Sequence, residues 1–225
     1  ATETAIRGHI DREEPANFPA VQELLAAHPD AFGTDAALSS LFTLWGARYQ
    51  PGQDTGCNQV RGQGLDCLFQ RGSWRSLVTL NLPAVLSLSD DQGNGYQVVL
   101  ASIGDQYAEL LVEDQLTKVG LLDLSSYWDG EFLLIWRPLA VGAPDIVPGY
   151  RGAEIPVLRD ALERVDGQAD SVADPELFDE RLAQRVRDFQ QKHRLEPDAI
   201  VGARTQIVLN LVSGTSSGPR LTGEQ

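Results

Sequence analysis

The spacing of apolar residues changes twice along the chain, and this change limits the fold more than any other feature of the sequence. Up to residue 80 the apolar positions recur at helical spacing, for example at Leu38 and Leu41. From Pro83 onward, short runs rich in Val, Ile and Leu alternate with turn sequences such as DDQGNG, which predicts a meandering antiparallel sheet. Helices followed by strands predict an α+β domain over residues 17–140.

Four helical segments are expected before the sheet, over residues 17–28, 34–48, 57–64 and 73–80. Asp35 is the expected N-cap of the second segment, because a side-chain oxygen there accepts from a backbone amide that the first turn leaves free. Ser73 is the expected N-cap of the fourth segment, and Gly64 is typical of a C-cap.

The sequence GAPDIVP predicts a Gly/Pro-rich linker over residues 141–149, after which the helical period returns. Apolar stripes then predict three helices, over residues 153–165, 179–193 and 201–212, in a small bundle that occupies residues 150–212. Residues 1–16 are expected to form a flexible lead-in, and the composition of residues 213–225 is typical of a disordered tail.

The chain is acidic, with 32 Asp and Glu against 18 Lys and Arg and a formal charge of −14 among 225 residues. This balance argues against a nucleic-acid partner and against docking on anionic lipid, since both need a concentrated positive surface. The sequence contains no apolar run long enough to span a membrane and no methionine. We therefore expect a piece of a longer protein whose membrane segment lies outside this sequence.

Cys57 and Cys67 are the two cysteines of the chain. Two cysteines alone cannot complete a four-ligand zinc site, so no metal or other cofactor is expected. Their chemistry leaves three alternatives open, namely buried free thiols, a disulfide in an oxidising compartment, and a catalytic cysteine.

The stretch RVRDFQQKHRLEPDAIVGARTQIVL, at residues 185–209, resembles the three-helix peptidoglycan-binding domain family. The matching residues are Val186, Phe189, Gln190, Leu195, Asp198, Val201, Gly202 and Thr205. Arg159 replaces the glutamine usual in the first helix of that family, and Ala199 replaces the glycine usual in the turn. The resemblance implies peptidoglycan binding through exposed polar groups on one side of the bundle. We expect these contacts to be made by Tyr150, Gln190, Asp198, Arg204 and Gln206.

The order of motifs from Asp35 to the LIWRP run resembles the papain-like cysteine peptidases that process double-glycine leaders. That chemistry needs a thiolate, an imidazole and a group that orients the imidazole. Ala36 stands at the expected nucleophile position and Gln97 at or beside the histidine position, whereas Asp114 matches the orienting carboxylate. A methyl group cannot attack a carbonyl and an amide is not a base at neutral pH. We therefore expect a domain with the peptidase fold and without peptidase activity.

Neither cysteine has an evident catalytic base. The three histidines are His9, His28 and His193, in the lead-in, an early helix and the other domain. None falls in the sheet, where the resemblance would place a base. Because peptidoglycan lies outside the cytoplasm, the resemblance favours a Cys57–Cys67 disulfide.

Together, the two domains resemble the periplasmic region of the general secretion pathway protein A family (ExeA type) of type II secretion. This resemblance implies a periplasmic part of an inner-membrane protein. With protein B of the pathway as its partner, it would anchor to peptidoglycan and help the outer-membrane secretin to assemble. Self-association stays open.

Two alternatives address the N-terminal domain. In the first, the chain is a hydrolase or peptidase acting on wall peptides, with Glu113 and Asp114 as a carboxylate pair. We expect adjacent strand residues to point to opposite faces, which argues against this pair. In the second, the vestigial cleft, lined by Gln97, Asp114 and Trp128, is a protein-docking surface.

Overall fold

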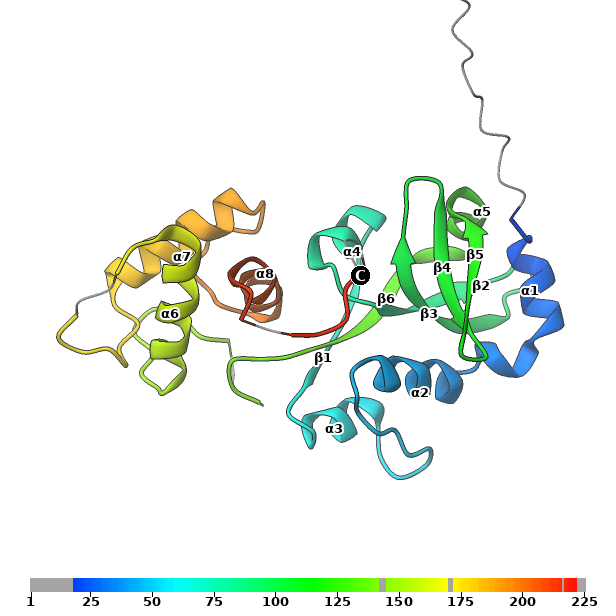
Figure 1. The fold of residues 1–225 in the computed structure, drawn as a ribbon, viewed down its shortest axis with the longest axis horizontal. Coiled ribbons are helices and arrows are strands. Elements are labelled where there is room, and N and C mark those ends of the chain that lie inside the picture. Colours follow the sequence, from blue (N-terminus) through cyan, green and yellow to red (C-terminus); the bar gives the residue numbers. More distant parts are fainter. Residues whose placement is uncertain (1–17, 142–144, 170–171, 216, 222–225) are drawn as a thin grey trace, which may run out of the picture.

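The computed structural model describes residues 18–141, 145–169, 172–215 and 217–221. It contains an N-terminal domain with a six-stranded sheet and a C-terminal domain of three helices, side by side along the longest axis (Figure 1). Within the described ranges, every helix is too short or too polar to cross a bilayer. The expected lead-in and His9 lie outside these ranges.

The sheet of the N-terminal domain has the strand order β1-β6-β2-β3-β4-β5, and each neighbouring pair is antiparallel. The strands are β1 (Asp66–Arg71), β2 (Ala84–Ser89), β3 (Gly95–Ile103), β4 (Tyr107–Val112), β5 (Gln115–Gly120) and β6 (Trp128–Trp136). The meander expected after Pro83 is therefore present. The sheet also gains an edge strand, β1, from the helical half of the domain.

Helices cover both faces of this sheet. They are α1 (Val21–Ala27), the 3-10 helix η1 (Pro29–Phe32), α2 (Thr34–Leu44), α3 (Gly56–Arg61), α4 (Trp74–Leu80) and α5 (Leu121–Tyr127). Alternation along β3 divides the core, because Val99 packs with Phe42 of α2, whereas Leu100 joins the cluster that contains Leu77 of α4 and Leu124 of α5.

Helix α2 differs from its expected bounds and cap. Its N-cap is Gly33, and Asp35 lies one residue inside the helix, so the expected Asp35 cap is wrong. Asp35 instead accepts a hydrogen bond of 2.6 Å from the hydroxyl of Tyr49, which raises the pKa of Tyr49 to about 12. By contrast, Ser73 caps α4 as expected, in a reciprocal capping box with Ser76.

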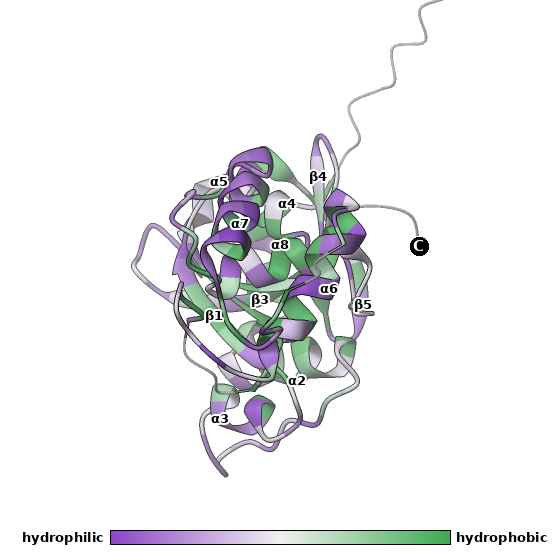
Figure 2. Ribbon diagram, turned by 90° about the vertical axis from the view of Figure 1, so that its left-hand side faces the viewer, coloured by the Kyte–Doolittle hydropathy of each residue, from purple (hydrophilic) through white to green (hydrophobic). Residues whose placement is uncertain are grey.

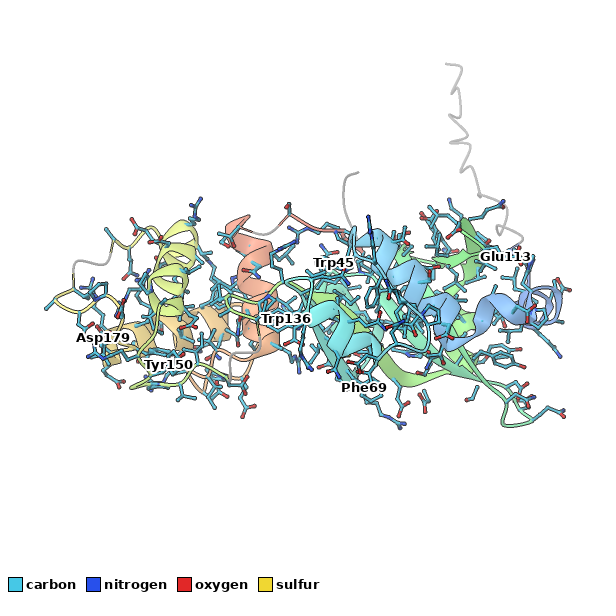
Figure 3. All side chains as sticks on the ribbon, turned by 90° about the horizontal axis from the view of Figure 1, so that it is seen from below. Trp45, Phe69, Glu113, Trp136, Tyr150 and Asp179 are labelled. Carbon is cyan, nitrogen blue, oxygen red and sulfur yellow. A yellow bond between two sulfur atoms is a disulfide. The ribbon has the colours of Figure 1, made fainter. Side chains whose placement is uncertain are left out.

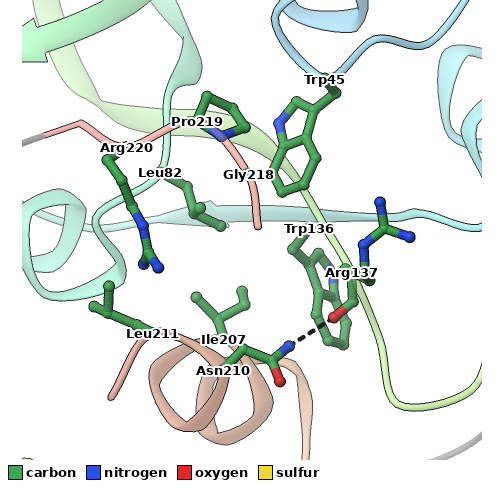
Figure 4. Close-up of a pocket in the computed structure, with 10 residues that line it drawn as sticks. All are labelled: Trp45, Leu82, Trp136, Arg137, Ile207, Asn210, Leu211, Gly218, Pro219 and Arg220. Atoms are coloured by element: carbon green, nitrogen blue, oxygen red, sulfur yellow. Dashed lines mark hydrogen bonds between the residues drawn. The ribbon is translucent and has the colours of Figure 1, made fainter. Parts of the chain in front are cut away.

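The C-terminal domain contains α6 (Glu154–Asp166), α7 (Glu180–Lys192) and α8 (Ala203–Ser213). Helix α7 is largely hydrophilic and α8 is not (Figure 2), because α8 lies between the other two helices and the N-terminal domain. Asn210 of α8 donates a hydrogen bond of 2.8 Å to the carbonyl of Arg137 (Figure 4). Buried side chains of both domains form one continuous cluster.

The described part of the tail is ordered, which corrects the expectation of disorder there. Residues 217–221 leave the C-terminal domain and return to the N-terminal domain, where Leu221 is 1% exposed. The amide of Leu221 donates to the carbonyl of Asn81 at 3.2 Å, and its carbonyl accepts from the amide of Ile103 at 3.3 Å. Gly218 and Arg220 line a small pocket with Trp45 (Figure 4). One apolar anchor in a polar stretch is enough to order it, and average composition hides such an anchor.

Candidate functional site

The vestigial cleft is a hollow of about 280 Å³ beside the start of α2. Its lining residues are Asp30, Ala31, Ala36, Ser39, Ser40, Leu111, Glu113 and Asp114. Two of the three residues assigned to the peptidase machinery, Ala36 and Asp114, therefore share one cleft. The residue that the resemblance aligns with the nucleophile is an alanine, and its methyl group cannot act as a thiolate.

Gln97 is not among the residues that line the cleft. It pairs with Ser87 across the sheet and lies two residues from Val99, on the face that α2 covers. Trp128 lies on the opposite face, where its ring is 4.2 Å from that of Trp74. The expectation that Gln97, Asp114 and Trp128 jointly line one cleft is therefore wrong.

Glu113 and Asp114 form the two-residue turn between β4 and β5, and both have left-handed backbone angles, with φ of 49° and 61°. This is the geometry of a tight hairpin, in which neighbouring side chains need not point to opposite faces. Both residues line the cleft, which corrects the expectation that they lie on a strand and point apart. His28 Nδ1 lies 3.2 Å from a carboxylate oxygen of Glu113.

Cys57 and Cys67 form a disulfide with a Cα–Cα distance of 5.5 Å. It joins α3 to β1 and uses both cysteines of the chain, so neither sulfur is a free thiol. The two described histidines are engaged elsewhere. His28 pairs with Glu113, and the His193 ring packs 4.5 Å from that of Phe189, where burial lowers its pKa.

A second hollow, which we call the junction groove, has a volume of about 540 Å³ and lies where the C-terminal domain meets β1. It is lined by Leu68, Asp145, Gln190, Arg194, Leu195, Glu196, Asp198, Ile200, Gly202, Ala203, Arg204 and Thr205. Three residues expected to contact peptidoglycan, Gln190, Asp198 and Arg204, are in this set. Asp198 and Arg204 are exposed.

Gln190 is 1% exposed, which corrects the expectation of an exposed ligand contact. Its amide nitrogen donates to Asp198 at 3.0 Å and to the carbonyl of Ile200 at 2.9 Å, and its oxygen accepts from the amide of Ala199 at 2.9 Å. A buried amide that satisfies backbone groups of a turn is a structural brace. Gln190 therefore fixes the turn that shapes the junction groove.

Gln206 and Tyr150 lie outside the junction groove. Gln206 is 6% exposed, and its side-chain oxygen accepts a hydrogen bond of 3.0 Å from the amide of Leu139, which ties α8 to the end of the N-terminal domain. Its expected exposure is therefore wrong. Tyr150 is half-buried, with its hydroxyl 3.2 Å from a carboxylate oxygen of Glu154.

The two departures from the peptidoglycan-binding pattern have different consequences. Arg159 is buried, donates to the carbonyl of Leu177 at 2.7 Å, and pairs with Asp179 at 3.0 Å. It thus braces the segment before α7. Ala199 is buried with φ of 67°, a left-handed conformation that costs an alanine more than a glycine.

The sequence patterns missed part of both hollows. Arg194 and Glu196 follow α7 in a segment that the motif treats as spacer, and Leu68 comes from the other domain. Patterns within one domain do not predict contacts with the other domain. The sequence therefore gave no indication that Leu68 lines the groove. The turn at Glu113 and Asp114 was also missed, because the sequence ED between the strands lacks the glycine that usually marks a two-residue hairpin turn.

Figure 3 places the vestigial cleft relative to the C-terminal domain. Glu113, at the rim of the vestigial cleft, lies at one end of the molecule, and Tyr150 and Asp179 of the C-terminal domain lie toward the other. Trp136, at the end of β6, lies between them. The junction groove and the vestigial cleft share no lining residue, so they are separate features.

Comparison with known proteins agrees with this two-part architecture. Residues 20–138 match the family model "GspA, peptidase C39-like domain", and residues 151–209 match a peptidoglycan binding domain model. General secretion pathway protein A of Aeromonas hydrophila is 31% identical over 204 residues, which are 90% of this chain and 36% of that protein. A second curated relative, from Escherichia coli strain K12, is 29% identical over 80% of this chain and 36% of its own length.

One solved structure is similar over both domains. It is the periplasmic domain of the EpsAB fusion protein of the Vibrio vulnificus type II secretion system, with 26% identity and a TM-score of 0.55. The match covers 84% of this chain and 82% of that one. The chain spans about a third of the length of its curated relatives. Because the first family model covers more than half of its residues, the chain belongs to the GspA family with a peptidase C39-like domain, followed by a peptidoglycan-binding domain.

Proposed function

We propose that the chain is a non-catalytic periplasmic module that binds peptidoglycan and, with protein B of the general secretion pathway, supports assembly of the outer-membrane secretin. The observation that carries the binding part is the match of residues 151–209 to a peptidoglycan-binding model, on a domain whose motif turn shapes an open groove. The disulfide between Cys57 and Cys67 supports an oxidising location.

The non-catalytic part of the proposal rests on the chemistry of the cleft. The sequence resemblance aligns Ala36 with the nucleophile and Gln97 with or beside the histidine, and both cysteines are in the disulfide. Without a nucleophile and a base in contact, acyl transfer loses the two groups that supply most of its rate. Asp114 matches the carboxylate that would orient an imidazole, but the resemblance aligns no histidine for it to orient.

The partner part of the proposal rests on the relatives. The solved relative is a periplasmic domain of the EpsAB fusion protein, a name that we interpret as an A protein fused to a B protein. A pair fused in one organism supports an association between separate chains in another. The vestigial cleft is a candidate docking surface for this partner, with Glu113 and Asp114 at its rim.

Co-sedimentation with purified sacculi tests the binding. We expect the chain to pellet with sacculi in a saturable way and to stay in the supernatant with cellulose particles, which form a neutral insoluble control. A chain that stays in the supernatant with sacculi would contradict the proposal.

A separate measurement tests the docking surface. Asp114→Ala is expected to weaken binding to the periplasmic region of protein B and to leave sacculus binding unchanged. Asp105→Ala, an exposed carboxylate in the turn before β4, is the matched control. Equal effects of the two variants on partner binding would argue against a role of the cleft.

A further inference from the structure

The junction groove is built from both domains. Most of its lining comes from the end of α7, the turn after it and the start of α8, but Leu68 belongs to β1 of the N-terminal domain and Asp145 to the segment between the domains. Asp145 lies against the turn as well, because a Cβ added at Gly202 would come within 3.0 Å of its carboxylate. The groove therefore depends on how the two domains meet.

The groove carries unpaired charges of both signs. Arg194 and Arg204 are exposed, and within the described parts of the chain neither side chain forms an ion pair or a hydrogen bond. The carboxylates of Glu196 and Asp145 likewise form no ion pair or side-chain hydrogen bond with any residue that the structure describes. Charged side chains left free around a groove keep their hydrogen-bonding capacity for a ligand.

The rest of the lining is apolar and aliphatic. Leu68, Leu195 and Ile200 contribute branched side chains, and none of the lining residues is aromatic. Flat ring-shaped ligands bind preferentially against aromatic faces, which this groove lacks. Aliphatic surface framed by charges of both signs suits a short peptide whose small side chains alternate with charged groups.

We propose that the junction groove binds the peptide stem of peptidoglycan rather than its glycan, and that Leu68 of the N-terminal domain forms part of the binding site. The inference rests on the proposed function. A stem peptide carries free carboxylates and, at its diamino acid, a free ammonium group. Its carboxylates match Arg194 and Arg204, and its ammonium group matches Glu196 and Asp145.

The glycan fits this groove less well. Its hydroxyl and acetamido oxygens accept hydrogen bonds from the two arginines, but they are neutral and cannot form the paired, bidentate contacts that a carboxylate forms with a guanidinium group. A zwitterionic peptide supplies the opposite charge for both signs of charge in the groove. Charge complementarity therefore separates the two parts of peptidoglycan at this site.

Competition during co-sedimentation of the whole chain with sacculi distinguishes the two ligands. Free tetrapeptide stem is one competitor. The other is glycan strands freed of peptides by an amidase, with the lactyl carboxylates that the cleavage exposes converted to neutral amides. We expect the tetrapeptide to release the chain from sacculi and the glycan strands to leave it bound. Release by glycan strands alone, or by neither competitor, would overturn the inference and leave peptidoglycan binding intact. A failure to sediment without any competitor would overturn the proposed function itself.

Variants locate the site. Arg194→Gln and Arg204→Gln are each expected to weaken sacculus binding on the order of tenfold, since each removes a charge-assisted contact. Arg164→Gln, an exposed arginine of α6 outside the groove, is the matched control and is expected to bind as the unmodified chain does. Equal binding by all three variants would place the ligand elsewhere.

A second pair of variants tests whether the N-terminal domain contributes to the binding site. Leu68→Gln is expected to weaken binding several-fold, whereas Phe69→Gln is expected to have no effect, because Phe69 is its neighbour on β1 and lies outside the groove. Thermal unfolding of both variants reports whether the fold is kept. If Leu68→Gln unfolds the chain, the two arginine variants still decide whether the groove is the site. Unchanged binding by a folded Leu68→Gln variant would remove the N-terminal domain from the site.

Discussion

The vestigial cleft and the junction groove show opposite relations between motif and chemistry. In the cleft, the fold of a peptidase persists around Ala36, and the proposed function holds that the reactive groups are missing. In the groove, most motif residues are kept, but the buried Gln190 holds the shape of the turn through its hydrogen bonds. The comparison teaches that a sequence motif reports first on architecture. In the proposed account, binding depends on the exposed residues that the architecture brings together, such as Arg194 and Arg204.

Substitution of Gln190 in the groove and of Gln97 in the N-terminal domain tests this difference most sharply. The Gln190 variant is expected to show the larger change in the free energy of unfolding. Gln190→Ala leaves the buried amide of Ala199 without its partner and removes one of the two side-chain hydrogen bonds to the carbonyl of Ile200, the other coming from Thr205. We expect a loss of about 2 kcal/mol in the free energy of unfolding, because an unsatisfied buried group costs about 1–3 kcal/mol. Urea denaturation measures the loss, and sacculus binding is expected to fall with it.

Gln97→Ala is the matched substitution in the N-terminal domain. Gln97 is a half-buried strand residue with no side-chain hydrogen bond within the described part of the chain. We expect a change within about 0.5 kcal/mol, as for substitutions away from the core and from buried networks. If Gln97→Ala destabilised the chain as much as Gln190→Ala, the contrast between the two sites would be lost.

Removal of the disulfide tests whether the N-terminal domain can be weakened without affecting the groove. The Cys57→Ser, Cys67→Ser double variant is expected to lose about 2–3 kcal/mol, since the bond closes a short loop and restricts the unfolded chain. Urea denaturation measures the loss. Sacculus binding of the remaining folded protein is expected to stay unchanged, because pairing with β6 still holds β1 and its Leu68 in place. A parallel loss of binding would show that the groove depends on the disulfide beside Leu68.

Acid should weaken the C-terminal domain through Asp179. Burial raises the pKa of this carboxyl, but hydrogen bonds from the amide of Leu182 and from Arg159 outweigh burial, and the net shift is downward. A lowered pKa in the folded state stabilises the fold above the ordinary pKa of about 4 and loses this contribution as the pH falls further. Thermal unfolding between pH 6 and pH 3 is therefore expected to show a smaller decline for Asp179→Asn. Identical declines would contradict the assignment.

The smallest expected effect is a gain. Ala199 has a left-handed backbone where the family pattern has glycine, so Ala199→Gly is expected to stabilise the chain by up to about 1 kcal/mol. The relief of strain is partly offset by the greater freedom of glycine in the unfolded chain. Chemical denaturation measures the change, and a clear destabilisation would mean that the buried methyl group of Ala199 contributes more than the strain costs.

The sequence predicted the helices of the C-terminal domain and the meander of the sheet, because periodicity and capping residues act locally. Ser73 and Asp179 cap helices as such signals indicate. What the sequence did not predict depends on contacts across the chain. Asp35 bonds Tyr49 instead of capping α2, and Leu221 anchors a tail that looks disordered by composition.

The candidate site was predicted in part for the same reason. Helical motif matching places Gln190, Asp198 and Arg204 near one another, but it does not distinguish a buried brace from an exposed contact. The distinction needs the position of every neighbour. The part of the groove that comes from β1 depends on the packing of α8 against the N-terminal domain, which no local pattern encodes.

One assay tests the central account most directly, namely the incubation of the chain with dye-labelled sacculi while bound protein and released dye are measured in the same tube. We expect saturable binding of the chain to the pellet, with dye release no greater than in buffer alone. The Arg204→Gln variant is expected to lower the bound fraction and leave the release unchanged. Dye release that rises with the amount of bound chain would contradict the account, because the protein would then cleave the wall that it binds.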